Sequence, residues 1–305
     1  MIDVAMVIGS LPVRGGDAHA SRRLVSAGGG FNVMSAVRRQ GLDTVYAGQL
    51  GRGPFAEVAR ASLDREGIAV GVRARGDVDL GICVVLVDAS GERTFVTASG
   101  AELTLGARDL VDVGVRASDV VYLSGYNVVY PEVSRSVVPW VSELALPIRV
   151  AFDPGPRVRD IDPDVLGALL ARVDWLLCNA EEARVLSGEE DVARGARALQ
   201  ARWGCEHVVV RDGARGCFSA HGAALRRAEG FDTVVVDTNG AGDVHNGVLM
   251  AELLRSTPLE EALLRANAAA AIAIATLGPA TCPLRADIDE MLRRQPRSVV
   301  GLERG

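Results

Sequence analysis

The chain contains no lysine: all 33 of its basic residues are arginine. A Walker-type phosphate loop, Schiff-base chemistry and a catalytic lysine are therefore excluded, since each depends on a lysine side chain. Any phosphate charge that the protein binds has to be balanced by arginine, by backbone N–H groups or by a metal ion.

Cysteine and histidine are also sparse, and neither has the spacing of a structural site. The five cysteines are odd in number and include no Cys-x-x-Cys pair, so we expect small buried hydrophobic side chains and no disulfide framework. The four histidines form no His-Glu-x-x-His pair, and no zinc site is expected. These residues are Cys83, Cys178, Cys205, Cys217 and Cys282, with His19, His207, His221 and His245.

Charge and hydropathy exclude two further classes of partner. The formal net charge is −6 and no block of basic residues occurs, so no nucleic-acid partner is expected. No apolar run reaches membrane-spanning length and the N-terminus does not resemble a signal peptide, which predicts a cytoplasmic protein with no membrane partner. With 305 residues and 49% hydrophobic content, the chain can form one large domain or two small ones.

One stretch near the C-terminus combines several features of a phosphate site. Residues 234–243 read Val-Val-Val-Asp-Thr-Asn-Gly-Ala-Gly-Asp, which predicts a buried strand, a turn of small residues and the start of a helix. The N–H groups of Gly240, Ala241 and Gly242 can approach an anion closely, and the positive end of the helix dipole favours one. A carboxylate at Asp243 would repel a phosphate unless it takes a proton from the attacking group. The alternative is an ordinary glycine-rich turn in which Asp243 only begins the helix.

The rest of the chain alternates between strands and helices, which predicts a parallel sheet covered on both faces. Ligands of such sheets bind beyond the carboxyl ends of the strands. Residues 82–97 depart from the alternation, because two apolar strands flank the turn Asp-Ala-Ser-Gly and form a β-hairpin. The expected strands are 4–9, 44–47, 120–123, 148–152, 175–178 and 207–211, with a second hairpin at 217–228; the expected helices are 32–40, 55–66, 133–144, 163–171, 180–186, 192–203, 259–275 and 286–294.

Two motifs together resemble the ribokinase/PfkB carbohydrate kinase family. Residues 237–243, Asp-Thr-Asn-Gly-Ala-Gly-Asp, are similar to its C-terminal signature. Residues 27–32, Ala-Gly-Gly-Gly-Phe-Asn, are similar to its N-terminal element, with Gly41 and Gly51 at the family's spacing. The resemblance runs over nearly the whole chain. It implies an α/β fold, a three-layer α/β/α sandwich with a mostly parallel central sheet (ribokinase-like), plus a small β-sheet lid.

The resemblance also implies an organisation and an activity. We expect a single kinase domain at residues 1–296, with lid segments at about 11–29 and 72–99, and a C-terminal tail at 297–305. The implied reaction transfers the ATP γ-phosphoryl group to a hydroxymethyl oxygen of a small sugar. Asp243 would be the general base, and the turn of Gly240, Ala241 and Gly242 would be the anion hole. A lid would exclude water from the reaction.

The acceptor site is expected at the N-terminal motif. Gly28, Gly29 and Gly30 let a polyhydroxylated ligand lie against the backbone, and the amide of Asn32 can both donate to and accept from hydroxyl groups. Alternatively, the glycines form a turn and Asn32 caps the next helix. Relatives with ribose-type substrates often carry an acid soon after the first strand, and Asp17 is the candidate here. Two departures from the family pattern, Arg14 and Arg52, indicate either a charged acceptor or solvated surface arginines.

The nucleotide site is expected on two later strand ends. Asn179 and Glu182 are similar to the family's Asn-x-x-Glu motif, in which Glu182 would hold Mg²⁺ through water and Asn179 would bond a phosphate. The alternative is a helix cap with acidic residues in its first turn. Residues 208–216 resemble the family's nucleotide loop and supply Arg211, Gly213 and Gly216 to ATP; a plain hairpin turn would use the same glycines. Asn267 matches a position near the adenine, although its alanine-rich helix also fits close packing.

Three further points stay open at this stage. Asp237, with carbonyls near Ala273, Thr276 and Gly278, matches a site where relatives bind potassium, whereas it would otherwise only cap the turn. Relatives often form a homodimer through the lid sheet, which would protect its edges and its apolar face. The competing functions are a nucleoside kinase of the same family and a catalytically weak nucleotide- or sugar-binding protein. A dinucleotide oxidoreductase is not expected, because no Gly-x-Gly-x-x-Gly follows the first strand.

Overall fold

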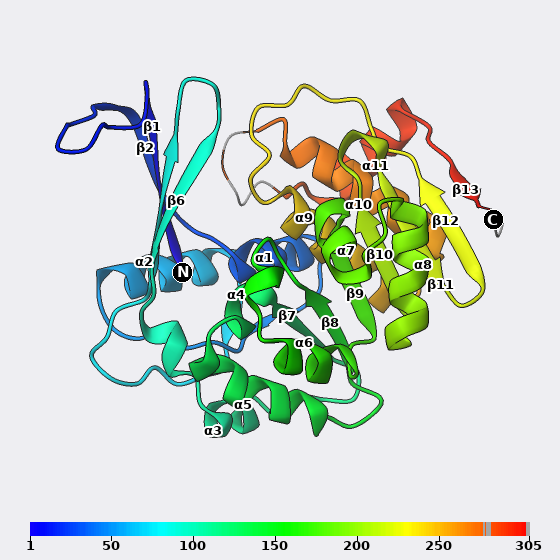
Figure 1. Ribbon diagram of the computed structural model, residues 1–305, viewed down its shortest axis with the longest axis horizontal. Helices are drawn as coiled ribbons and strands as arrows, with labels where there is room; N and C mark the ends of the chain where they lie inside the picture. The colour runs from blue at the N-terminus through cyan, green and yellow to red at the C-terminus, as the bar shows by residue number, and fades with distance from the viewer. Residues whose placement is uncertain (277, 279–281, 303–305) are drawn as a thin grey trace.

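The computed structural model describes residues 1–276, residue 278 and residues 282–302. Its main body is built on a seven-stranded sheet with the order β13-β12-β11-β10-β9-β8-β7 (Figure 1). Four neighbouring strands are parallel, and three antiparallel strands extend the sheet at one edge. The strands are β7 (Val120–Ser124), β8 (Arg149–Asp153), β9 (Trp175–Asn179), β10 (His207–Arg211), β11 (Cys217–His221), β12 (Ala224–Ala228) and β13 (Val299–Gly301).

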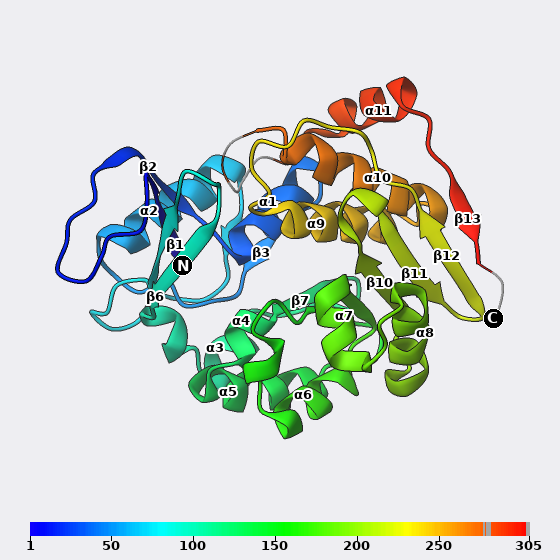
Figure 2. The ribbon, with the colours of Figure 1, turned by 45° about the horizontal axis from the view of Figure 1, so that its top comes forward.

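Helices cover both faces of this sheet, because its central strands are apolar on both sides. Val150 and Phe152 of β8 belong to one hydrophobic core, whereas Ala151 between them belongs to the other. The covering helices are α1 (Gly30–Arg39), α5 (Pro131–Ser142), α6 (Pro163–Leu170), α7 (Ala180–Ser187), α8 (Val192–Trp203), α9 (Ala241–Leu254), α10 (Leu259–Ala273) and α11 (Arg285–Arg294). Figure 2 shows α5 to α8 on one side and α1 with α9 to α11 on the other, which confirms the three-layer sandwich.

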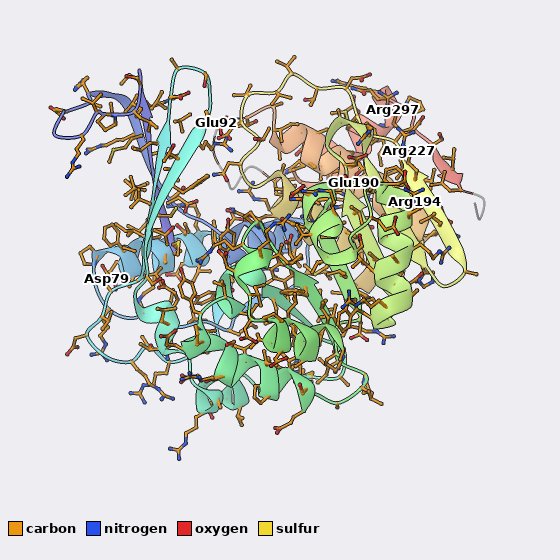
Figure 3. The ribbon with its side chains drawn as sticks, in the orientation of Figure 1. Asp79, Glu92, Glu190, Arg194, Arg227 and Arg297 are labelled. Carbon is orange, nitrogen blue, oxygen red and sulfur yellow. The ribbon has the colours of Figure 1, made fainter. Side chains whose placement is uncertain are left out.

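A four-stranded sheet, which we call the small sheet, projects from this body. Its order is β2-β1-β5-β6, with β1 (Ile2–Ile8) antiparallel to β2 (Ala20–Ala27) and parallel to β5 (Ile82–Val87). β5 and β6 (Arg93–Ala98) form the predicted hairpin. Figure 3 shows Glu92 beside the hairpin turn, on the side of the loop that precedes α9. The small sheet therefore stands next to the loop that leads into the predicted phosphate turn.

The base of the small sheet is fixed to the body by α2 (Pro54–Glu66). Asp79, just before β5, accepts the N–H groups of Phe55 and Ala56 in the first turn of α2, at 3.0 and 2.8 Å (Figure 3). Ile2 and Val4 pack with Leu63 of this helix in a third, smaller core. One face of β1 is therefore covered near the base of the small sheet, and the other face is left for the cleft described below.

The predicted buried strand at residues 234–236 is wrong. This segment is an exposed loop: the side chains of Val234, Val235 and Val236 are 79%, 59% and 55% exposed. The sheet edge beside β11 is taken by β12, so no neighbouring strand is left to pair with the three valines. Instead, the N–H groups of Val236 and Asp237 both donate to the carbonyl of Ile274, at 2.8 and 3.0 Å.

Several short elements were not predicted. β2 forms from a polar, arginine-rich sequence that shows no strand period, and it pairs along the whole of β1. Within the expected C-terminal tail, β13 pairs with β12; residues 303–305 of that tail lie outside the described residues. The other elements that were not predicted are β4 (Ala69–Val70), α3 (Ala107–Asp112), α4 (Gly125–Val128) and the 3-10 turns Ala101–Thr104, Val158–Asp160 and Gly213–Arg215, whereas β3 (Val45–Tyr46) forms within the strand expected at 44–47. In the part of the chain that the structure describes, no helix combines the length and the apolarity that crossing a bilayer would require.

Candidate active site

The centre of the site is the contact between α1 and α9. A Cβ atom added at Gly247 would lie 2.5 Å from the Cβ of Ala36, so only a glycine lets the two helices approach this closely. One turn nearer the N-terminus of each helix, Nδ2 of Asn32 donates to Oδ2 of Asp243 at 2.9 Å. The helix packing therefore places the amide of the first motif on the carboxylate of the second, 211 residues apart.

The turn before α9 has the predicted form. Gly240 has a φ of 76°, the left-handed conformation that favours glycine, and α9 begins at the next residue. The N–H of Ala241 makes a turn bond of 3.3 Å to the carbonyl of Thr238. The N–H groups of Gly242 and Asp243 have no acceptor among the described residues. These free donors and the start of a 14-residue helix make the turn suited to an anion.

A buried arginine lies directly under this turn. Arg211, the last residue of β10, donates from Nη2 to Oδ2 of Asp153 at 3.0 Å and from Nη1 to the side-chain oxygen of Asn246. Nδ2 of Asn246 donates to the same Asp153 oxygen at 2.6 Å, and Oε2 of Glu182 lies 3.8 Å from Arg211. A Cβ at Gly242 would be 3.4 Å from the guanidinium. The turn thus rests on a fixed positive charge.

Burial shifts the protonation of this cluster. It raises the pKa of Asp243 to about 7, with Asp153 adding to the rise and the hydrogen bond from Asn32 opposing it. Burial and the charge of Asp153 likewise raise the pKa of Glu182. For Arg211, burial acts to lower the pKa, but the carboxylates of Asp153 and Glu182 outweigh it and raise the pKa. The combined negative charge of the two carboxylates is larger than the positive charge of the one guanidinium. This part of the site can therefore accommodate a further positive charge.

The nucleotide-motif residues meet at the ends of β9 and β10. Asn179 and Glu182 form a capping box: Oδ1 of Asn179 accepts from the N–H of Glu182 at 2.9 Å, and the Glu182 carboxylate accepts from both nitrogens of Asn179 at 2.8 Å. The helix-cap interpretation is therefore present in the structure. It does not exclude a ligand role, because Glu182 also adjoins Arg211 under the phosphate turn.

Two of the other three nucleotide candidates have structural tasks as well. A Cβ at Gly216 would lie 2.1 Å from the carbonyl oxygen of Ala228 at the end of β12. Only a glycine therefore fits at this position, just before β11. Nδ2 of Asn267 donates to the carbonyls of Ala228 and Glu229 at 3.2 and 3.0 Å, and its Oδ1 contacts Nε2 of His245 at 3.0 Å. Gly213 has a φ of 57° and open space around it.

On the acceptor side, the structure brings forward a residue that the sequence interpretation missed. A Cβ at Gly28 would lie 2.2 Å from the carboxylate of Asp3, so the glycine makes room for this side chain. Asp3 contributes to the raised pKa of Asp243. Asp17, by contrast, lies on an exposed loop with no described polar contact. Oδ1 of Asn32 is buried without a hydrogen-bond partner among the described residues.

Comparisons with known proteins agree with this geometry. A family model described as pfkB family carbohydrate kinase matches residues 2–286. The chain belongs to this family. It is 30% identical over 292 residues to the sugar kinase YegV of Escherichia coli K12, and the alignment covers 94% of this chain and 90% of that protein. It is 28% identical over 283 residues to an ATP-dependent ribose-1-phosphate kinase of Halopiger xanaduensis, covering 92% and 91%.

The fold comparison extends to solved structures. The nucleoside kinase of Methanocaldococcus jannaschii, an archaeal member of the ribokinase family, superposes with a TM-score of 0.80 at 14% identity and covers 96% of this chain and 95% of that one. At this identity the likeness shows the fold. The protein is a kinase of the pfkB carbohydrate kinase family, a phosphotransferase.

The kinase has a cavity of about 130 Å³ between the small sheet and the loop that precedes α9. Its wall includes alternate residues of β1 and β5, Asp3 among them, four residues of β2, and residues of the loop. Asp237 of this loop is occupied on both oxygens: Oδ1 accepts from Arg93 and from the N–H of Asn239, and Oδ2 accepts from the N–H of Gly278 at 3.0 Å. A monovalent cation at Asp237 stays a prediction.

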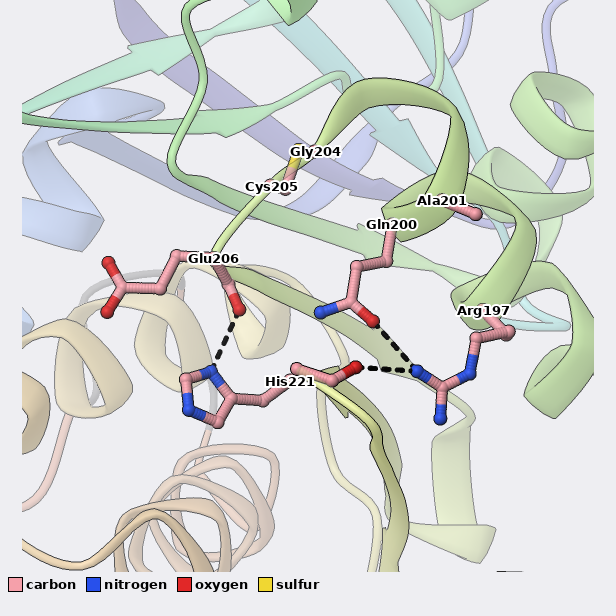
Figure 4. A pocket seen from close by; sticks show the side chains of 8 residues that line it. Arg197, Gln200, Ala201, Gly204, Cys205, Glu206 and His221 are labelled. Carbon is pink, nitrogen blue, oxygen red and sulfur yellow. Dashed lines mark hydrogen bonds between the residues drawn. The ribbon is translucent and has the colours of Figure 1, made fainter. Parts of the chain in front are cut away.

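A larger cavity, about 500 Å³, lies elsewhere (Figure 4). It is lined by the end of α8 and the residues before β10, at the edge of the sheet opposite to the carboxyl ends of the strands. Several of its polar groups are paired within the protein: Nδ1 of His221 contacts the carbonyl of Glu206 at 2.9 Å, and Arg197 donates to Gln200 and to the carbonyl of Gly222. The smaller cavity, which adjoins the loop leading to the turn of α9, is therefore the better candidate for part of the active site. Across the described residues, no three of His, Cys, Asp or Glu are grouped to hold a metal by themselves.

Proposed function

We propose that the kinase transfers the γ-phosphoryl group of ATP to a hydroxymethyl oxygen of a small sugar. Asp243 is the general base in this proposal, and Gly240, Ala241 and Gly242 form the anion hole. The observation that carries it is the position of Asp243: a carboxylate whose pKa is about 7, held by Asn32 and adjoining the free N–H groups of the turn. A pure binding protein gains nothing from a carboxylate beside phosphate.

The proton transfer follows from the pKa of the base. A group with a pKa near 7 is about half deprotonated at neutral pH, and its deprotonated form is basic enough to take a proton in the transition state. The acceptor hydroxyl gives its proton to Asp243 as its oxygen forms a bond to the γ-phosphorus, and the bond from that phosphorus to the bridging oxygen breaks to release ADP. Asn32 keeps the carboxylate oriented through Nδ2, and its free Oδ1 can accept from a second hydroxyl of the acceptor.

The charge that develops on the phosphoryl oxygens is met by fixed groups. The N–H groups of Gly242 and Asp243 donate to it, and Arg211 supplies a positive charge behind the turn. Because Arg211 is held by Asp153 and Asn246, it needs no reorganisation during the reaction. Phosphoryl transfer depends mainly on such positioning and electrostatics.

The nucleotide would lie over the ends of β9 and β10, near Asn179, Arg211, Gly213 and Gly216, with Asn267 supporting this loop from below. The excess of negative charge at Glu182 and Asp153 fits a magnesium ion held through water by Glu182. When bound, Mg²⁺ neutralises charge on the ATP phosphates. A potassium ion at Asp237 is part of the same proposal only if it can displace Arg93.

The acceptor would lie between Gly28, Gly29, Gly30 and the small sheet, with Asp3 in the place first considered for Asp17. The half-buried carboxylate of Asp3 can accept from sugar hydroxyls. The small sheet acts as the lid over this cleft, within one kinase unit, and so keeps water from the transferring phosphoryl group. A nucleoside is the alternative acceptor, since its nucleobase would need only an aromatic or apolar surface to lie against.

The test is ADP release from Mg-ATP over a panel of sugars and nucleosides, with and without potassium. The proposal predicts that one acceptor class raises ADP release well above the ATP-only rate, with a phosphate ester formed at the hydroxymethyl oxygen. Stimulation by nucleosides alone would select the nucleoside kinase. If no acceptor stimulates release while nucleotide still raises the melting temperature, the protein is a binder and the proposal is wrong.

A further inference from the structure

The face of the small sheet that lines the cavity is arranged in three rows. The registers place Ser26, Asp3, Cys83 and Thr97 side by side across the four strands at the base of the face. The middle row is apolar and the outer row is Arg22, Val7, Val87 and Arg93. Polarity therefore changes along the cleft, from hydroxyl and carboxylate groups at the base to two guanidinium groups at the outer end.

The two arginines of the outer row are placed to share one ligand. They lie on the two edge strands, with the small side chains of Val7 and Val87 between them. Three strand spacings separate their Cα atoms by about 14 Å, a gap that two arginine side chains can bridge from both sides. Both line the cavity, together with Arg23. The cavity wall thus carries three guanidinium groups against the carboxylates of Asp3 and Asp237.

The partners of these arginines differ. Arg93 is held on the loop before α9 by Asp237 and by the Thr238 hydroxyl at 3.5 Å. The guanidinium of Arg22, an exposed residue, makes no hydrogen bond or ion pair to any other described residue; only its backbone pairs, with Val7 of β1. A guanidinium without a protein partner beside a cavity, facing a second one that is fixed, is the arrangement that recognises phosphate or carboxylate.

We propose that the acceptor carries an anionic group, at the end remote from its reacting hydroxymethyl, and that Arg22 and Arg93 bind this group. The inference rests on the proposed function, because it takes Asp243 and Asp3 as the reacting end. From Asp3 to the outer row is four residues along β1, about 13 Å. That length suits a sugar extended by one substituent, such as a pentose 1-phosphate or an aldonic acid, once the arginine side chains reach inward.

The structure also reassigns the charged residues singled out in the sequence. Arg14 lies on the exposed loop between β1 and β2, and Arg52 precedes α2; neither lines the cavity. In this proposal the charged group of the acceptor is therefore bound by Arg22 and Arg93, and not by Arg14 or Arg52. Arg14 becomes the matched control, since it is an exposed arginine of the same segment.

The experiment compares ribose, ribose 1-phosphate, ribonic acid and a neutral nucleoside as acceptors, in wild type, Arg22→Gln and Arg14→Gln. In wild type, we expect kcat/KM for an anionic acceptor to exceed that for ribose by about 30-fold or more, and its KM to rise with salt. In Arg22→Gln, we expect this kcat/KM to fall about 10- to 100-fold, through KM, with ribose changed by less than about threefold. Arg14→Gln should match wild type. The phosphate and carboxylate arms then identify the anion.

Ribose or the nucleoside as the best acceptor, or an equal effect of Arg22→Gln on charged and neutral acceptors, would overturn the inference while leaving the kinase proposal intact. Thermal shift without ATP gives an independent readout. If no acceptor is phosphorylated but ribose 1-phosphate still stabilises wild type and not Arg22→Gln, the anion site stands and the proposed reaction fails. If ribose 1-phosphate neither reacts nor stabilises, and ribonic acid does neither, the inference is wrong.

Discussion

The floor of the active site and the small sheet above it are built in opposite ways. On the floor, Arg211, Asp153 and Asn246 are buried or nearly so and bond to one another. On the small sheet, Arg22 lines the cavity and Phe95 belongs to the same face, and both residues are exposed to solvent. The floor is an interlocked polar network in which each group depends on the others. The small sheet offers positions that can change without cost to the fold, which is where acceptor specificity can vary.

The largest effect on stability should come from removing the centre of the floor. Arg211→Met leaves Asp153 and Glu182 buried without their counter-charge, so the free energy of unfolding should fall by about 3–5 kcal/mol. Urea unfolding measures it. Arg194→Met, at a solvent-exposed ion pair with Glu189, is the control and should change it by less than about 1 kcal/mol. Equal effects of the two variants would show that the floor is not interlocked.

The helix contact that aligns the base is the next target. Gly247→Ala puts a methyl group against Ala36, which should cost about 1–3 kcal/mol and lower kcat as Asn32 and Asp243 move apart. Ala36→Gly in the same chain should restore part of both. Gly167→Ala, in α6 with open space around its Cβ position, is the control. Unchanged kcat in Gly247→Ala would separate the helix contact from catalysis.

The pH profile tests the electrostatics of the floor. Because Asp243 must be deprotonated to act, kcat/KM should rise with pH through an apparent pKa of about 7. Asp153 raises the pKa of Asp243, so Asp153→Asn should move this limb to lower pH. Asp160→Asn, at an exposed ion pair, should leave it in place. If Asp153→Asn leaves the apparent pKa of kcat/KM unchanged, the group that titrates is not Asp243.

The same pKa has a consequence for stability. The folded-state pKa of Asp243 lies above its unfolded value of 3.8, so folded protein holds the proton more tightly and loses stability as pH rises toward 7. Asp243→Asn does not ionise and avoids that loss. Its gain in unfolding free energy over wild type should therefore be larger at pH 8 than at pH 5, by about 2–3 kcal/mol. A pH-independent difference would contradict the raised pKa.

The smallest effect on the fold is expected on the face of the small sheet that points away from the cavity. We propose this face as a homodimer surface. Val25 and Val96 share this face and are 46% and 60% exposed. Val96→Asp should convert a dimer to a monomer, measured by light scattering after gel filtration, with little change in melting temperature. Val111→Asp, at a side chain 69% exposed on α3, is the control. A wild-type monomer would remove the proposal.

The comparison also explains what could be predicted from sequence. The parallel strands were predictable because burial on both faces gives continuous apolar runs in the sequence. The β5–β6 hairpin was predictable because a clear turn sequence separates its two apolar strands. Residues 234–236 show the limit: three consecutive valines fit a buried strand, and only the occupied sheet edge decides against it. β2 was missed because its pairing is imposed by β1 and not by its own polar sequence.

At the site, the motif residues were predictable and their supports were not. Asp243, Asn32 and Arg211 were singled out by motif, and the structure brings the first two into contact. Asp153 had a signal that went unused: it follows a buried strand, as Asn179 and Arg211 do. Asn246 lies one helical turn after Asp243. Asp3 had none, because only the fold brings it to Gly28.

The central claim is that Asp243 is the base of a phosphoryl transfer. The most direct measurement is kcat/KM of Asp243→Asn with the best acceptor, beside a melting curve at the same pH. We predict a loss of about 10³-fold, roughly 4 kcal/mol in the barrier, in a protein at least as stable as wild type. A variant that keeps its activity within about tenfold of wild type would show that Asp243 is not the base.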